Sequence, residues 1–133
     1  MNDRFRFRAW DKVCGRMLYN IQEAYDGGCV EDKEGEPVED YISVCSFASF
    51  FPYEGQEENE YIVEQCTGLK DKNGNLIYEG DIVKEGVIKW NDFTGCFMVV
   101  FPDGDNREFG EIYVGYLEVI GNIHEHGGLL NEN

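Results

Sequence analysis

The sequence has few of the side chains that enzymes use to attack a substrate or move protons. Among its 133 residues there are only two histidines, His124 and His126. The serines and threonines are Ser43, Ser46, Ser49, Thr67 and Thr94, and none stands in a nucleophile motif. No glycine-rich loop follows a predicted strand and opens a helix, as a phosphate site requires. These deficits predict a protein that is not an enzyme.

Metal and cofactor signals are also missing. A His-x-His pair in a strand can hold a metal on one side, but the sequence indicates no third ligand near His124 and His126. The cysteines, at positions 14, 29, 45, 66 and 96, number five, and none forms a Cys-x-x-Cys pair. This pattern excludes a disulfide framework and argues against zinc. We therefore expect free, mostly buried thiols, no metal and no cofactor.

The chain contains no long hydrophobic run. No apolar stretch approaches the roughly 18 residues that a membrane helix needs. The first six residues, Met-Asn-Asp-Arg-Phe-Arg, lack the apolar centre of a signal peptide. The sequence thus predicts a cytoplasmic protein with no membrane association.

Positive charge is scarce and unevenly placed. Lysine and arginine total 11 against 27 acidic residues, a net charge of −16. Residues 1–16 are locally basic at +3, whereas residues 17–66 carry −12 and the remainder −7. Such an acidic protein repels a phosphate backbone, so nucleic acid is an unlikely partner.

Turn signals are abundant in the middle of the chain. Asn73-Gly74 tolerates the positive φ of a tight hairpin, and Asp71 can bond the backbone two residues further on. A second break follows at Gly80-Asp81, and Gly68 precedes the hairpin. We interpret Gly68, Asp71, Asn73, Gly74, Gly80 and Asp81 as structural turn residues.

Three stretches carry a family resemblance. They are Arg6-Phe7-Arg8-Ala9-Trp10-Asp11, the segment 67–83 (Thr-Gly-Leu-Lys-Asp-Lys-Asn-Gly, then Ile-Tyr-Glu-Gly-Asp-Ile-Val), and Ile120 to Ile123. In this order they resemble the signature of the YopX family of phage and prophage proteins. The resemblance implies no catalytic motif or reaction. The chain departs from the family at Cys66, where an aromatic residue is common, and at His126-Gly127, where the family tends to show Asn-Pro.

The N-terminal segment alternates arginine with apolar residues. In a strand, Arg4, Arg6 and Arg8 would face one side while Phe5, Phe7 and Ala9 face the other. One interpretation is a partner contact made by Arg4, Arg6, Arg8 and Trp10. The other is that the arginines balance carboxylates of the protein itself, within one protomer or across an oligomer interface. The overall charge favours the second.

The first half contains two acidic loops and one ambiguous window. Residues 31–40 and 54–60 are acidic and low in apolar content, which predicts exposed loops. Between them, residues 41–53 fit both a strand pattern and a helical i, i+3, i+4, i+7 stripe. Periodicity leaves helix and strand open there.

The second half is typical of a small barrel. From residue 81 onward we expect short strands at 81–84, 86–90, 96–101, 112–116 and 117–123. The predicted fold class is mainly β, or α+β with one short helix. It consists of an N-terminal β subdomain (1–66), a hairpin with an SH3-like β-barrel (67–126) and a frayed tail (127–133).

The favoured function is a non-catalytic phage or prophage accessory protein acting through protein–protein contacts. We expect a homo-oligomer, with an unknown host or phage protein as a further partner. One alternative is an acidic DNA-mimic decoy for a host nucleic-acid-binding protein, because carboxylates at phosphate-like spacing can occupy a basic groove. A less favoured alternative is a nucleic-acid-binding small barrel that uses the N-terminal arginines.

Overall fold

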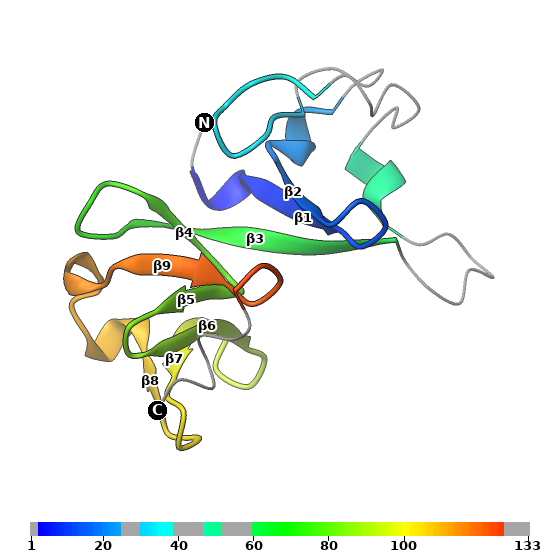
Figure 1. Cartoon of the computed structure of the whole chain (residues 1–133). Coiled ribbons are helices and arrows are strands. Elements are labelled where there is room, and N and C mark those ends of the chain that lie inside the picture. Colours follow the sequence, from blue (N-terminus) through cyan, green and yellow to red (C-terminus); the bar gives the residue numbers. More distant parts are fainter. Residues whose placement is uncertain (1–2, 25–29, 39–46, 52–59, 127–133) are drawn as a thin grey trace. The chain divides into compact units, whose positions relative to one another are not determined.

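The computed structural model describes residues 3–24, 30–38, 47–51 and 60–126. The chain divides into two compact units, Met1–Gln65 and Cys66–Asn133 (Figure 1). Both are built from antiparallel sheets, and every helix among the described residues is a 3₁₀ turn of three or four residues. The mainly β fold class is therefore confirmed. Residues 41–46 and 52–53 of the ambiguous window, 54–59 of the second acidic loop, and the tail 127–133 lie outside the described residues.

The first unit centres on strand β1 (Phe7–Asp11). It pairs antiparallel with β2 (Arg16–Tyr19) on one side and with the first half of β3 (Tyr61–Lys70) on the other. The strand predicted to begin at Arg4 begins only at Phe7. Arg4 instead lies in a 3₁₀ turn, η1 (Asp3–Phe5), whose carbonyl at Asp3 accepts the N–H of Arg6 at 3.0 Å.

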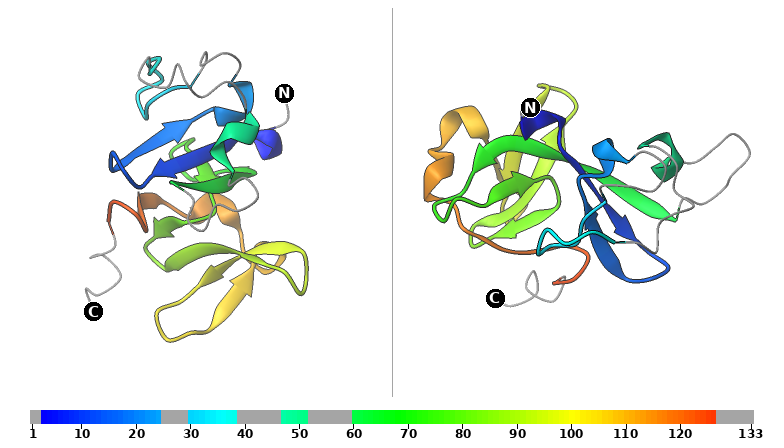
Figure 2. Two further views of the ribbon diagram at one scale, coloured as in Figure 1. Left: turned by 90° about the vertical axis from the view of Figure 1, so that its right-hand side faces the viewer. Right: turned by 90° about the horizontal axis from the view of Figure 1, so that it is seen from above.

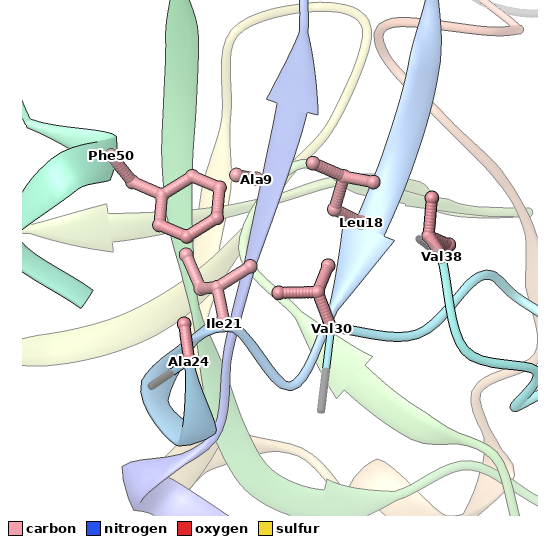
Figure 3. Close-up of a cluster of buried hydrophobic side chains, with 7 residues drawn as sticks. All are labelled: Ala9, Leu18, Ile21, Ala24, Val30, Val38 and Phe50. Carbon is pink, nitrogen blue, oxygen red and sulfur yellow. The ribbon is translucent and has the colours of Figure 1, made fainter. Parts of the chain in front are cut away.

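A compact apolar cluster fills the first unit (Figure 3). Two 3₁₀ turns, η2 (Ile21–Glu23) and η4 (Phe47–Phe50), contribute to it. Its buried members are Ala9, Leu18, Ile21, Ala24, Val30, Val38 and Phe50. The Phe50 ring meets Tyr61 edge-on with centroids 5.0 Å apart. The part of the ambiguous window that the structure describes is thus a helical turn that buries one phenylalanine.

The second unit contains a five-stranded sheet of order β8-β7-β6-β5-β9. Its strands are β5 (Asp81–Val83), β6 (Gly86–Asn91), β7 (Cys96–Val100), β8 (Asn106–Glu108) and β9 (Val119–Asn122). The last strand returns to pair with the first, β9 beside β5. This order, and the curl of the sheet visible in Figure 2, are those of an SH3-like barrel left half open. A separate hairpin joins the second half of β3 to β4 (Leu76–Tyr78).

One strand prediction in the barrel is wrong. Residues 112–116 are not a strand, because the chain forms two 3₁₀ turns, η5 (Phe109–Glu111) and η6 (Val114–Tyr116). The fourth strand is β8, in a stretch where no strand was predicted. The i, i+3 spacing of Val114 and Leu117 explains the turn, since both side chains enter the core.

The core of the second unit gathers side chains from the barrel strands and from η6. Its buried members are Ile77, Val83, Ile88, Val99, Val114 and Leu117. Phe97, Phe109, Ile112 and Val119 pack against it as partly buried neighbours. The tips of the hairpins and the outward residues of η6 remain in solvent.

Two hairpin loops share one sequence pattern and one geometry. Residues 32–36 read Asp-Lys-Glu-Gly-Glu, and residues 71–75 read Asp-Lys-Asn-Gly-Asn. In each loop the N–H of the Asp donates to the carbonyl of the fifth residue, at 2.9 Å and 2.8 Å respectively. In each, the Asp Oδ1 accepts two backbone N–H groups, from Glu34 and Glu36 or from Asn73 and Asn75. The glycines, Gly35 and Gly74, both have φ of 83°, which a side chain would strain.

A buried ion pair joins β1 to β3. Arg8 Nε donates to Glu64 Oε1 at 2.8 Å, and their side chains are only 3% and 5% exposed. The two residues face each other in the strand register. A second pair, Arg6 with Asp3 at 2.8 Å, is about one-third exposed on each side. The two pairs therefore provide a buried and a solvated version of the same interaction.

We expect Glu64→Gln to destabilise the protein by about 3–5 kcal/mol, because it removes the negative charge from a buried ion pair with Arg8. The matched variant Asp3→Asn should cost at most about 1 kcal/mol, since water screens an exposed pair. Urea unfolding followed by circular dichroism measures both. If both variants lose the same free energy of unfolding, burial does not set the contribution of the Arg8–Glu64 pair.

Candidate functional site: an exposed tyrosine pair held by the 71–75 hairpin

Asp71 is the polar centre of the second unit. Its side chain is buried, and both carboxylate oxygens are used. Oδ1 accepts the N–H groups of Asn73 and Asn75, each at 2.9 Å, which closes its own hairpin. Oδ2 accepts the N–H of Val119, at 2.9 Å, from a segment 48 residues away. Asp71 thus ties the hairpin to the start of β9, whereas its counterpart Asp32 makes no such long-range bond to any residue that the structure describes.

The electrostatics of Asp71 follow from this geometry. Burial raises the pKa of its carboxyl, but the N–H donors of Val119, Asn75 and Asn73 favour the charged form and outweigh burial. The pKa consequently lies below its usual 3.8. Asp71 is therefore an ionised, buried anchor and not a proton donor at neutral pH.

The hairpin also holds the segment before β9. The N–H of Lys72 donates to the carbonyl of Leu117 at 2.9 Å, and Lys72 Nζ lies 2.8 Å from Glu118 Oε2. In Figure 1 the green hairpin after β3 and the orange segment before β9 lie side by side. Hydrogen bonds to the carbonyl of Leu117 and from the N–H of Val119 thus hold the chain directly after η6.

Tyr113 and Tyr116 form an exposed aromatic pair on this fixed segment. Their ring centroids are 4.7 Å apart at an interplanar angle of 73°, an edge-to-face contact. The side chains are nevertheless 70% and 78% exposed. Val114 and Leu117, which alternate with them, are buried in the core. The 3₁₀ turn therefore directs two aliphatic side chains inward and two aromatic rings outward.

Gly115 belongs to this arrangement. A Cβ placed on it would lie 3.0 Å from the Cε1 and Cζ atoms of Tyr113. The Tyr113 ring therefore lies close against Gly115, and a Cβ at that position would require the ring to move by a few tenths of an ångström. We call Tyr113, Gly115 and Tyr116 the tyrosine corner, which is distinct from the hydroxyl-bonded tyrosine corner of Greek-key β-sandwiches. The buried side chains of Val114 and Leu117 and the hydrogen bonds at Leu117 and Val119 hold the backbone of the corner, while its two rings stay in solvent.

The β6–β7 hairpin displays other aromatic residues. Phe93 at its tip is fully exposed, and Trp90 is 43% exposed. Trp90 meets Phe97 edge-on at 4.9 Å, and Phe97 in turn packs on the core. Phe93 has no such ring contact among the described residues. It is the natural control for the tyrosine corner, being equally aromatic, in the same unit, and not part of the corner.

The four residues proposed as partner contacts do not form one surface strip. Arg8 is buried against Glu64, and Arg6 pairs with Asp3 and donates to Asn20 Oδ1 at 2.8 Å. Arg4 is exposed, and its guanidinium carbon lies 5.7 Å from the Phe5 ring centroid. Trp10 is half-buried in β1. The interpretation that arginines balance the chain's own carboxylates is the one that fits Arg6 and Arg8.

The predicted turn residues are placed as follows. Asn73 and Gly74 form the hairpin turn, and Gly80 lies in the turn before β5. Asp81, also buried, accepts the N–H of Tyr78 through Oδ2 at 2.8 Å. The prediction of a turn at Gly68 was wrong, because Gly68 lies inside β3, where the strand register shifts.

The histidines have a local role in the last turn. Asn122, at the end of β9, donates its N–H to His126 Nδ1 at 3.1 Å, and its Oδ1 accepts the N–H groups of His124 and Glu125. Among the residues that the structure describes, no three His, Cys, Asp or Glu side chains come together as metal ligands would. An open depression at the β7–β8 turn is lined by Phe101, Pro102, Asp103, Asp105 and Arg107.

Carboxylates that the decoy alternative would present are partly used inside the protein. Asp11, Glu64, Asp71 and Asp81 are buried. Asp32 and Asp103 bond backbone N–H groups in their own turns. Within the described ranges, then, many acidic groups serve local structure.

Fold and site together define a small, mainly β protein whose SH3-like unit displays an exposed aromatic pair. A family model described as YopX protein matches residues 6–131. The chain belongs to the YopX family, which confirms the resemblance found in its motifs.

Comparison with individual proteins adds little. The chain is similar to a crystal structure of protein EF1440 from Enterococcus faecalis, with 26% identity and a TM-score of 0.47 over 94% of this chain and 96% of that chain. No curated protein matches it. No helix among the described residues is long and apolar enough to span a membrane.

Tyr113 and Tyr116 were not predicted as site residues, because the sequence pattern assigned their segment to a strand. A usable signal was present. Val114 and Leu117 are spaced by three, as in a helical turn, and Gly115 stands between the two tyrosines. That pattern indicates a turn with its aromatic residues on the outer face.

We expect Asp71→Asn to cost about 1–3 kcal/mol, because an amide supplies one acceptor oxygen and turns an N–H₂ group toward a backbone donor. Asp32→Asn should cost about 0.5 kcal/mol or less, since only Oδ1 of Asp32 is engaged and an amide oxygen replaces it. Urea unfolding at pH 7 measures both.

The difference between wild type and Asp71→Asn should also depend on pH. A carboxyl whose folded pKa is depressed contributes stability above its unfolded pKa and loses it as pH falls through the folded value. The advantage of wild type should therefore shrink below about pH 4. A constant difference from pH 7 to pH 3 would show that the charge on Asp71 is not what stabilises the fold.

Proposed function

We propose that the protein is a non-catalytic accessory protein of a phage or prophage that acts by binding other proteins through its SH3-like unit. The observation that carries this proposal is the tyrosine corner. Two aromatic rings, 70% and 78% exposed, meet edge to face on a short segment whose neighbouring residues Val114 and Leu117 are buried and whose following residue Val119 is bonded to Asp71. Tyrosine is enriched at the energetic centres of protein interfaces.

Order at the corner matters because binding costs conformational entropy. An immobilised side chain loses about 0.5–1.5 kcal/mol on association, and a preorganised one has already lost it on folding. The rings of Tyr113 and Tyr116 contribute little to the core, since Val114 and Leu117 fill that role. A constrained aromatic pair that leaves its rings in water is more easily explained by a contact with a partner than by stability.

Self-association is one form that such contacts can take. The sequence led us to expect a homo-oligomer, and this stays a prediction. Sedimentation velocity over a range of protein concentrations measures the assembly state directly.

We expect Tyr113→Ser/Tyr116→Ser to abolish partner binding while changing the free energy of unfolding by no more than about 1.5 kcal/mol, the range of one aromatic pair. The measurement is affinity capture from lysogenic cells, followed by reciprocal capture with the recovered protein as bait. Phe93→Ser is the matched control and should bind as wild type does.

The proposal fails if wild type sediments as a strict monomer and no partner survives reciprocal capture. It also fails if the double variant captures the same partner as wild type. If Phe93→Ser loses as much partner binding as the double variant, the binding surface is not specific to the tyrosine corner.

A further inference from the structure

We propose that the tyrosine corner binds an arginine side chain presented by an extended basic segment of a partner protein. This inference rests on the proposed function and names the chemistry that the corner recognises. It is carried by the geometry of the ring pair and by the charge of the surrounding chain.

The spacing of the rings suits one cation. A cation is attracted to an aromatic face when it lies within about 6 Å of the ring centroid. The centroids of Tyr113 and Tyr116 are 4.7 Å apart, so a single guanidinium can lie within that distance of both. With the rings at 73° to each other, the pair forms a corner and not a flat stack.

Arginine fits this corner better than lysine. Its guanidinium is planar, stacks on aromatic faces and is less strongly hydrated than an ammonium group. The hydroxyl groups of Tyr113 and Tyr116 form no hydrogen bond with any other described residue. Each phenol oxygen can therefore accept an N–H from an incoming guanidinium.

The charge of the chain points to a basic partner. Net charge is −16, which attracts cationic segments at long range. Glu111 and Glu118 each stand two residues from a corner tyrosine, so their Cα atoms lie within about 7 Å of it. Lys72 is the nearby positive group, and its pair with Glu118 is about half exposed on both sides. An exposed pair of this kind is weak enough for an arriving arginine to compete with.

The test uses the full chain and a capped Gly-Ser peptide that carries two arginines. A second peptide replaces both arginines with citrulline, which keeps the shape but removes the charge. A third carries prolines in their place. Binding is followed at 0.15 M salt by chemical-shift changes of the assigned tyrosine ring resonances. Local shifts separate a contact at the corner from diffuse attraction to an acidic surface.

We expect the arginine peptide to shift the ring signals of Tyr113 and Tyr116, and the citrulline peptide to leave them unchanged. Tyr113→Leu and Tyr116→Leu keep an apolar side chain without a ring, and each should weaken binding about 2- to 5-fold. Glu111→Gln should weaken it and reduce its salt dependence. Phe93→Leu, the matched control, should bind as wild type does.

The inference is overturned if arginine and citrulline peptides bind equally, if Phe93→Leu weakens binding as much as the tyrosine variants, or if the proline peptide binds more tightly. It is also overturned if the tyrosine variants abolish self-association, because the occupant is then a second copy of this chain.

The two proposals fail in different ways. If partner capture needs the tyrosines but the arginine peptide does not bind, the proposed function stands and the cation inference falls. If the peptide binds at the corner but capture ignores the tyrosines, the inference stands and the proposed function falls.

Discussion

The second unit depends on one carboxylate that is buried, ionised and bonded on both oxygens. Asp71 closes its own hairpin through Oδ1 and holds Val119 through Oδ2. An unpaired carboxylate in this place would be costly, so the three N–H groups that reach it stabilise the folded state. This requirement couples the hairpin at residues 71–75 to the segment that carries η6. The same segment carries the tyrosine corner.

The two Asp-Lys-x-Gly-x loops show how context changes the role of one motif. Asp32 and Asp71 make the same local bonds with nearly the same distances. Of the two, only Asp71 is buried, and among the described residues only Asp71 has a distant amide on its second oxygen. A local pattern thus specifies the turn in both places. Long-range contact converts one of the two turns into an anchor.

The same division applies to what the sequence could predict. The turn at Asn73-Gly74 and the bonds of Asp71 depend on local backbone preferences, and the structure has the expected turn. The three family motifs were likewise recognisable, and Asp71, Asp81 and Asn122 act through bonds that their side chains make in turns. The helical turn at 114–116 was missed because short apolar runs fit both periods. The segment with Arg4, Arg6 and Arg8 was predicted to be a strand from Arg4 onward. Alternation does not reveal that η1 occupies the residues before β1, or that Arg8 is buried opposite Glu64.

By itself the sequence determined the β class, the positions of the tightest turns, the acidic charge and the family, because each depends on residues close together in the chain or on simple totals. Tertiary structure alone decided which of two similar aspartates is buried, which arginines are neutralised, and which aromatic rings remain in water. Those outcomes depend on partners far away in the sequence, such as Val119 for Asp71 and Glu64 for Arg8. Pairing across such distances is settled by how the strands pack, and no local pattern records it.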